Sequence, residues 1–138
     1  MNTPLQVLVA EDNADLSEML QAFLQEQPDM RCLGAVDTLA ELRAQAEKYG
    51  AAHADGACAV VLDIELRGES SLRQLRALRA AWPAAHFIIF SGHNQPELKR
   101  GAQAAGAAGY VVKSDGPEAL LQALRELLRP SVPMADAG

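Results

Sequence analysis

Short hydrophobic runs and amphipathic stretches alternate along the chain, five of each. A run of about four to eight apolar residues is typical of a buried strand, whereas apolar residues at three- and four-residue spacing mark one face of a helix. The pattern predicts strands at 5–10, 30–36, 57–62, 87–90 and 110–112. It predicts helices at 16–24, 39–49, 72–82, 96–105 and 117–128.

Residues that start and stop helices agree with these boundaries. Pro28 follows the first helical stretch and ends it, and Thr38 with Glu41 three residues later has the spacing of a capping box. Pro117 stands where a first helical position is expected. The stretch 50–56 is small and polar, which predicts a surface loop before the third strand.

Five repeats of strand then helix predict an α/β fold with a five-stranded parallel, doubly wound sheet and helices on both faces. Right-handed crossovers and the size of the chain favour a flavodoxin-like strand order, 2-1-3-4-5. The 138 residues suit one domain, placed at 1–129. We expect 130–138 to be a disordered tail that is too short for an output domain.

Charge and composition narrow the functional classes. The formal net charge of −6 argues against direct binding to a nucleic-acid backbone. No apolar stretch approaches the roughly 20 residues that cross a bilayer, and no secretory signal opens the chain, so we expect a cytoplasmic protein without membrane insertion. Cys32 and Cys58 are expected to be reduced core thiols, with a disulfide or metal pair as the alternative.

Polar residues follow the predicted strands at their carboxyl ends, where ligands bind in an open parallel sheet. They are Glu11, Asp12, Asp63, Ser91 and Lys113. Each close pair of carboxylates costs on the order of 4 kcal/mol at an effective dielectric near 20, and one lysine does not offset that cost. Either the carboxylates stay protonated or a divalent cation lies among them, and hard oxygen ligands suit Mg²⁺. Such a site fits phosphoryl transfer onto Asp63, with Lys113 and Ser91 contacting the phosphate.

At this point four motifs, in order along the chain, resemble the response-regulator receiver family of two-component signalling. They are Val-Leu-Val-Ala-Glu11-Asp12-Asn13, Val-Val-Leu-Asp63, Ile-Ile-Phe-Ser91-Gly92 and Gly-Tyr110-Val-Val-Lys113. The resemblance covers roughly residues 5–128. Residues 109–120 are most similar to receivers that precede a helix-turn-helix output domain, and with only nine residues after Arg129 we expect a stand-alone regulator.

The resemblance implies a role for each residue of the predicted site. Glu11, Asp12 and Asp63 would bind Mg²⁺ together with the backbone carbonyl of Glu65. Asp63 would take a phosphoryl group from a histidine kinase or phosphotransfer protein, with Lys113 assisting. The chain would catalyse only its own phosphorylation and dephosphorylation.

Ser91 and Tyr110 would form a switch pair in which the hydroxyl moves to the phosphate and the ring turns inward. A downstream protein would bind the surface of the fourth helix, fifth strand and fifth helix, and a homodimer is a further expectation. The fourth helix has a thin apolar face with Gly101 inside it, which suits a segment that shifts.

Three positions depart from the family pattern. Arg67 and Ser71 stand where proline and glycine are common, so the loop after Asp63 is expected to differ in shape. Ser114 replaces a proline that is usually cis, so no cis peptide is expected there.

Other interpretations stay open at this stage. Glu11 and Asp12 suit a helix N-terminus as well as a cation, and Tyr110 suits ordinary packing. The arginines near the third helix fit either a solvated face or an acidic partner. Two rival functions are a phosphatase with an aspartyl nucleophile and a pseudo-receiver that acts as a phosphorylation-independent interaction module.

Overall fold

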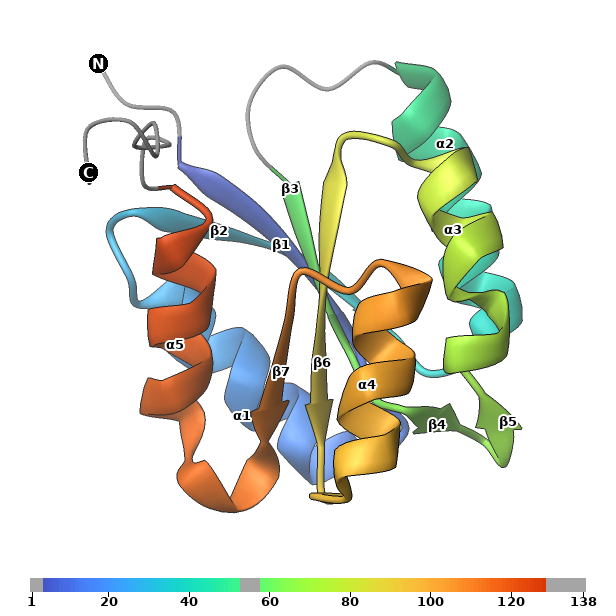
Figure 1. The fold of residues 1–138 in the computed structure, drawn as a ribbon. Coiled ribbons are helices and arrows are strands. Elements are labelled where there is room, and N and C mark those ends of the chain that lie inside the picture. Colours follow the sequence, from blue (N-terminus) through green and yellow to red (C-terminus); the bar gives the residue numbers. More distant parts are fainter. Residues whose placement is uncertain (1–3, 53–57, 129–138) are drawn as a thin grey trace, which may run out of the picture.

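The computed structural model describes residues 4–52 and 58–128, and Figure 1 shows a central sheet between two layers of helices. Five parallel strands form the sheet in the order β2-β1-β3-β6-β7. They are β1 (Leu5–Ala10), β2 (Met30–Val36), β3 (Cys58–Leu62), β6 (Ala85–Ser91) and β7 (Gly109–Val112). The fold class and the 2-1-3-4-5 order predicted from the sequence are confirmed, whereas the predicted tail lies outside the described residues.

Two hydrophobic cores lie on the two faces of this sheet. The helices are α1 (Ala14–Gln25), α2 (Leu39–Ala52), α3 (Leu75–Ala81, after a 3₁₀ turn at Leu72–Gln74), α4 (Pro96–Ala105) and α5 (Pro117–Glu126). α1 and α5 pack on one face, and α2, α3 and α4 pack on the other. β3 is buried on both sides along its whole length, as its unbroken apolar run predicted.

The predicted surface loop at 50–56 is wrong at its start, because α2 continues through Gly50 to Ala52. A Cβ atom at Gly50 would collide with the backbone carbonyl oxygen of Ala81. Glycine therefore serves close packing between α2 and α3 here, and not a turn. The rest of the predicted loop, 53–56, lies outside the described residues.

A small antiparallel hairpin follows Asp63 and was not predicted. Its strands are β4 (Glu65–Leu66) and β5 (Glu69–Ser70), joined by Arg67 and Gly68. Both turn residues have positive φ, 52° at Arg67 and 81° at Gly68. The residue pattern did not predict this hairpin because its strands have two residues each and its turn lacks the Asn-Gly or Asp-Gly signature.

One irregularity interrupts the ladder between β1 and β2. Val7 pairs with Cys32 but Leu8 pairs with Gly34, so Leu33 is an extra residue in β2. Gly34 next to it has φ of 127°, in the region that favours glycine. The bulge reverses the alternation of β2, so Cys32 packs on the α1/α5 core while Val36 packs on the other.

The remaining sequence expectations concern single residues. Cys32 and Cys58 are both free thiols, half-buried and buried respectively, on strands separated by β1. Thr38 caps α2 by accepting the backbone N–H of Glu41 at 3.1 Å. None of the helices within 4–52 and 58–128 is long and apolar enough to span a bilayer.

Candidate functional site

Three carboxylates meet at the carboxyl edge of the sheet, where the strand ends predicted them. Glu11 and Asp12 directly follow β1 and Asp63 directly follows the neighbouring strand β3. The backbone N–H of Asp63 donates to the carbonyl of Ala10 at 3.1 Å, which keeps the two strand ends together. One carboxylate oxygen from each of the three acids lies within 4.8 Å of the others. The edge thus concentrates negative charge at one point.

Lys113 supplies the positive charge. Its Nζ lies 2.8 Å from Glu11 Oε1 and 3.0 Å from Asp63 Oδ2, at the start of a 3₁₀ turn directly after β7. Burial by itself would lower the pKa of Lys113, but hydrogen bonds to the two carboxylates outweigh it and leave the pKa above 10.5. The ammonium is therefore charged at neutral pH and bridges two of the three acids.

Glu11 is the buried member of the acidic set, with its side chain only 3% exposed. Burial raises the pKa of Glu11, and the hydrogen bonds from Lys113 and from the Asn13 N–H act in the opposite direction. The first helix is capped by Asn13, whose Oδ1 accepts the Leu16 N–H at 2.9 Å. Glu11 and Asp12 are therefore not needed to cap the helix, because Asn13 caps it.

The hairpin after Asp63 contacts the site at two points. The backbone N–H of Arg67 donates to Asp12 Oδ2 at 2.8 Å, and the buried hydroxyl of Ser71 donates to the Asp63 carbonyl at 2.6 Å. The guanidinium of Arg67 reaches Asp37 Oδ2 at 2.7 Å. Two of the three positions that depart from the family pattern, Arg67 and Ser71, thus hydrogen-bond to the two aspartates of the site.

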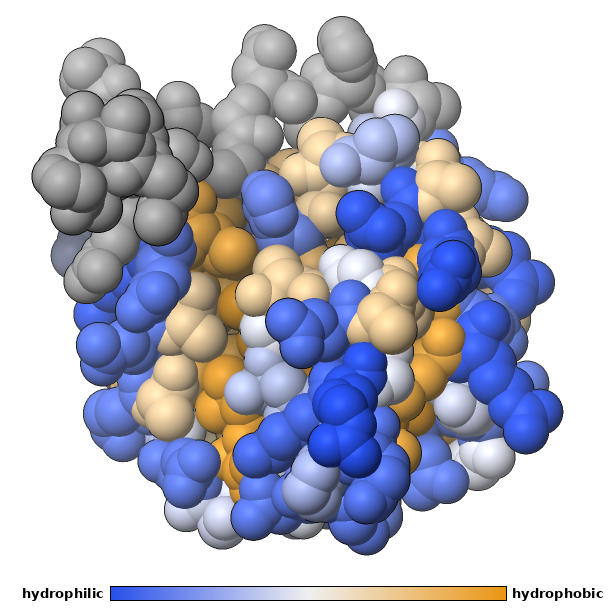
Figure 2. All heavy atoms as spheres, viewed as in Figure 1, coloured by the Kyte–Doolittle hydropathy of each residue, from blue (hydrophilic) through white to orange (hydrophobic). Residues whose placement is uncertain are grey.

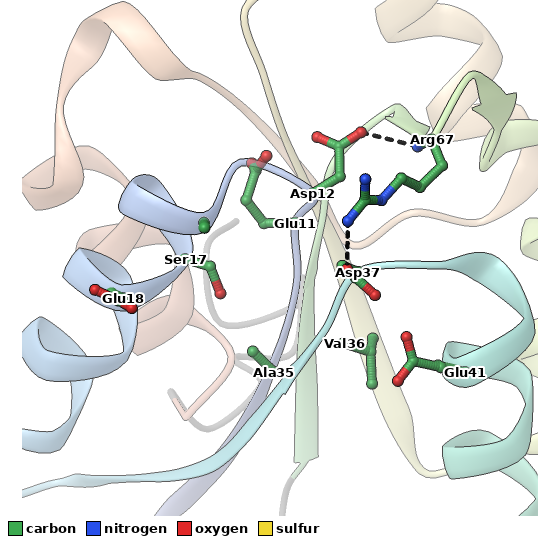
Figure 3. Close-up of a pocket in the computed structure, with 10 residues that line it drawn as sticks. Glu11, Asp12, Ser17, Glu18, Ala35, Val36, Asp37, Glu41 and Arg67 are labelled. Atoms are coloured by element: carbon green, nitrogen blue, oxygen red, sulfur yellow. Dashed lines mark hydrogen bonds and ion pairs between the residues drawn. The ribbon is translucent and has the colours of Figure 1, made fainter.

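A cleft of about 270 Å³ opens beside Glu11 and Asp12 (Figure 3). It is lined by Glu11, Asp12, Ala14, Ser17, Glu18, Ala35, Val36, Asp37, Glu41 and Arg67. In Figure 3 the Arg67 side chain extends from the hairpin to Asp37 at the end of β2. Asp63 does not line this cleft, so the cleft adjoins the carboxylate cluster and does not contain all of it.

The donor set fits a hard divalent cation. Mg²⁺ prefers oxygen ligands, keeps several waters and is held in many proteins by one or two carboxylates. Glu11, Asp12 and Asp63 offer such oxygens within the 4.8 Å cluster. The side chain of Glu65 is exposed and its backbone N–H lies 3.5 Å from Asp63 Oδ1, so the role expected for its carbonyl stays a prediction.

Ser91 and Tyr110 are connected through the backbone of one residue, His93. Ser91 ends β6 fully buried, and its Oγ accepts the His93 N–H at 3.1 Å. The half-buried Tyr110 donates its hydroxyl to the His93 carbonyl at 2.8 Å. The His93 side chain itself is exposed, so the residue makes both contacts through main-chain atoms. Main-chain bonds of this kind leave no signal in a residue pattern.

The arginines near the third helix are partly explained by packing between helices. Arg73, Arg76 and Arg79 are all exposed. Arg76 donates to the carbonyl of Ala104 at 3.2 Å, near the C-terminal end of α4. A cation at that end interacts favourably with the helix dipole.

No cis peptide bond occurs among the described residues, and the bond before Ser114 is trans, as expected from the missing proline.

Comparison with known proteins gives one consistent family. The family described as response regulator receiver domain matches residues 7–125. The nitrate/nitrite response regulator protein NarP of Escherichia coli K12 is 28% identical over 123 residues, which are 89% of this chain and 54% of NarP. The chain therefore spans about half the length of this relative.

Solved structures agree on the fold. A DNA-binding response regulator of the LuxR family from Staphylococcus aureus superposes with a TM-score of 0.76 at 21% identity, covering 90% of this chain and 98% of that one. A response regulator protein from Burkholderia pseudomallei, solved with a phosphorylated aspartic acid, a calcium ion and citrate, gives 0.70 at 19% identity, covering 95% and 78%.

Proposed function

The chain belongs to the family of response regulator receiver domains, and from that premise we propose that Asp63 accepts a phosphoryl group from a histidine kinase or a phosphotransfer protein. The observation that carries the proposal is the bridge from Lys113 to Asp63 and Glu11 at the carboxyl edge of the sheet. A receiver of two-component signalling is a switch and not an enzyme that turns over a separate metabolite.

In the proposed reaction a carboxylate oxygen of Asp63 forms a bond to phosphorus. The bond from phosphorus to the donor's imidazole nitrogen breaks, and its electron pair stays on the imidazole. Lys113, already 3.0 Å from Asp63, is placed to neutralise charge on the phosphoryl oxygens. Glu11, Asp12, Asp63 and the carbonyl of Glu65 would hold Mg²⁺, which when bound supplies positive charge to the developing phosphate.

The switch that we propose runs through His93. A phosphate on Asp63 offers a stronger acceptor to the Ser91 hydroxyl, and movement of that hydroxyl removes the acceptor of the His93 N–H. The His93 carbonyl holds Tyr110, so the tyrosine is released by the same displacement. α4 begins three residues after His93 and follows the change.

The readout surface that we propose is formed by α4, β7 and α5, toward a downstream protein or a second copy of the chain. Figure 2 shows hydrophobic side chains exposed as an orange strip between the hydrophilic outer faces of these helices. A cleft of about 490 Å³ in this region combines apolar residues of β7, α5 and their neighbours, among them Gly109, Ala119, Ala123 and Leu127, with the polar Gln122 and Glu126. Such a cleft suits apolar contact with a protein.

The experiment is intact-protein mass spectrometry after incubation with acetyl phosphate, with and without Mg²⁺. The native chain is expected to gain one phosphoryl group only with Mg²⁺, and Asp63→Asn is expected to gain none. Glu69→Gln is the matched control, because it removes an exposed acid of the adjacent hairpin that contacts neither the carboxylates nor Lys113. Lys113→Ala should slow the gain.

Two outcomes would contradict the proposal. Turnover of a small phosphomonoester that depends on Asp63 would make the chain a phosphatase. Failure of the native chain to be labelled by acetyl phosphate and also by phosphorylated histidine kinases would leave an interaction module that works without phosphorylation.

A further inference from the structure

We propose that Arg67 is a positioning residue for the phosphoacceptor site: its backbone N–H orients the Asp12 carboxylate, and its guanidinium holds that N–H in place through Asp37. The inference deepens the proposed function and rests on it, since it assigns a role at the same site. It starts from the hairpin that follows Asp63.

Arginine is an unfavourable residue for the turn that it occupies. Leu66 pairs with Glu69, so Arg67 and Gly68 form a two-residue turn in which both residues have positive φ. Such turns favour Asn-Gly or Gly-Gly, because a side chain at positive φ crowds the backbone. A strained backbone persists where the surrounding structure fixes it, and such positions cluster at functional sites.

The backbone N–H of Arg67 is fixed to the acidic cluster. It donates to Asp12 Oδ2 at 2.8 Å, a short charge-assisted hydrogen bond. A bond to one oxygen fixes the plane of the carboxylate and the direction of its remaining lone pairs, and Asp12 belongs to the set of acids within 4.8 Å. Proline at this position has no N–H and could not donate the bond.

The side chain of Arg67 holds the turn over the site. Its Nη2 lies 2.7 Å from Asp37 Oδ2, and Asp37 directly follows β2, where the Arg67 side chain reaches it from the hairpin (Figure 3). The ion pair connects the hairpin tip to the main sheet. It also neutralises a guanidinium close to the cation site, since the hydrogen bond to Asp37 and, to a smaller extent, the charge of Asp12 raise the pKa of Arg67.

The test is calorimetric binding of Mg²⁺ to the unphosphorylated full chain, with three variants. Arg67→Pro removes the N–H donor and, because proline fixes φ at about −65°, also the positive-φ turn that aims it. Mg²⁺ affinity is expected to fall about 10-fold or more, the usual effect of losing a partner that orients a metal ligand. Arg67→Asn keeps the N–H in an Asn-Gly turn but loses the ion pair to Asp37, so its Mg²⁺ affinity should fall about as much as in Asp37→Asn and less than in Arg67→Pro. Asp37→Asn leaves the guanidinium without its carboxylate and should weaken binding by less than Arg67→Pro.

Two calorimetric outcomes would overturn the proposal. Native affinity in Arg67→Pro would show that the N–H does not orient Asp12. A loss in Arg67→Asn equal to that in Arg67→Pro would also overturn it, because the N–H is present in one and absent in the other. Glu69→Gln, in the same hairpin, is the control for a general change in charge and should bind as the native chain does.

A second measurement on the native fold covers the case in which Arg67→Pro does not fold, which thermal unfolding would reveal. The Arg67 amide is expected to exchange slowly with solvent and to exchange faster in Asp12→Ala. Fast exchange in the native chain would overturn the proposal. Normal Mg²⁺ binding without phosphate gain at Asp63 would instead refute the proposed function alone.

Discussion

α4 and α5 flank the same edge strand, β7, on opposite faces of the sheet, and they differ in what they bury. Each has ten residues and a proline in its first turn. α5 buries three leucines, at positions 120, 121 and 124, whereas α4 buries two alanines, at 102 and 105. Burial of a leucine side chain contributes about 1.5–3 kcal/mol, far more than burial of a methyl group.

The two helices are also held differently at their ends. Arg125 of α5 donates to both carboxylate oxygens of Asp29 and to the side chain of Gln27, in the turn before β2. α4 is held by the bond from Arg76 to a backbone carbonyl at its C-terminal end. The difference shows how one sheet edge combines a fixed helix with a weakly held one, and the weakly held helix is the one next to Ser91 and His93.

The largest expected effect comes from removing the core of the fixed helix. Leu124→Ala should lower the free energy of unfolding by about 3 kcal/mol, because the side chain is fully buried. Leu98→Ala in α4 should cost about 1 kcal/mol, because Leu98 is only half-buried. Urea denaturation of both variants measures the difference, and equal losses would contradict the comparison.

A smaller effect should come from strengthening α4. Gly101→Ala is expected to stabilise the protein by about 0.5–1 kcal/mol, because glycine in a helix interior is unfavourable. A Cβ atom there meets only Leu72 Cδ1 at 3.9 Å, an ordinary contact. In Gly101→Ala, hydrogen exchange should slow in α4 and not in α5.

A beryllofluoride phosphate mimic should change hydrogen exchange in α4 of the native chain. Unchanged exchange on adding the mimic would argue against α4 as the switch.

The smallest effect concerns the Arg125–Asp29 pair. Its hydrogen bonds lower the pKa of Asp29 below the ordinary 3.8, so the pair stabilises the folded chain above that pH and loses its contribution as pH falls through the lowered pKa. Asp29→Asn should unfold at a slightly lower temperature at neutral pH, since an exposed pair contributes little. The unfolding temperatures of the two chains should converge once the pH falls below the lowered pKa of Asp29, and a gap that persists there would assign the effect to packing.

The sequence predicted correctly those helices and strands whose buried residues recur at a regular spacing. The leucines of α1 and α5 and the unbroken run of β3 identified their elements because burial follows directly from spacing. The acidic cluster followed from topology, since parallel strands end at one edge. Lys113, predicted at this edge as a contact of the phosphate, pairs with both Asp63 and Glu11.

The features that the sequence did not predict depend on contacts of backbone atoms. Gly50 was predicted to lie in a loop, but it lies in α2 and is packed against the backbone carbonyl of Ala81. The hairpin at Arg67 is fixed by its N–H, and His93 joins Ser91 to Tyr110 by its own N–H and carbonyl. Every residue except proline carries these groups, so no side-chain pattern marks where they act.

The bulge in β2 bears on how the length of this chain can change over evolution. Leu33 is the one residue of β2 without a partner in β1, and the pairs on either side of it, Val7 with Cys32 and Leu8 with Gly34, already stand in register. Loss of Leu33 would give a continuous ladder and still leave the Glu11 N–H bonded to the Val36 carbonyl. In β3, where every residue is paired and buried, the same deletion would move the side chains of half of the strand to the opposite face of the sheet. Related chains should therefore vary by one residue at this point of β2 and not in β3.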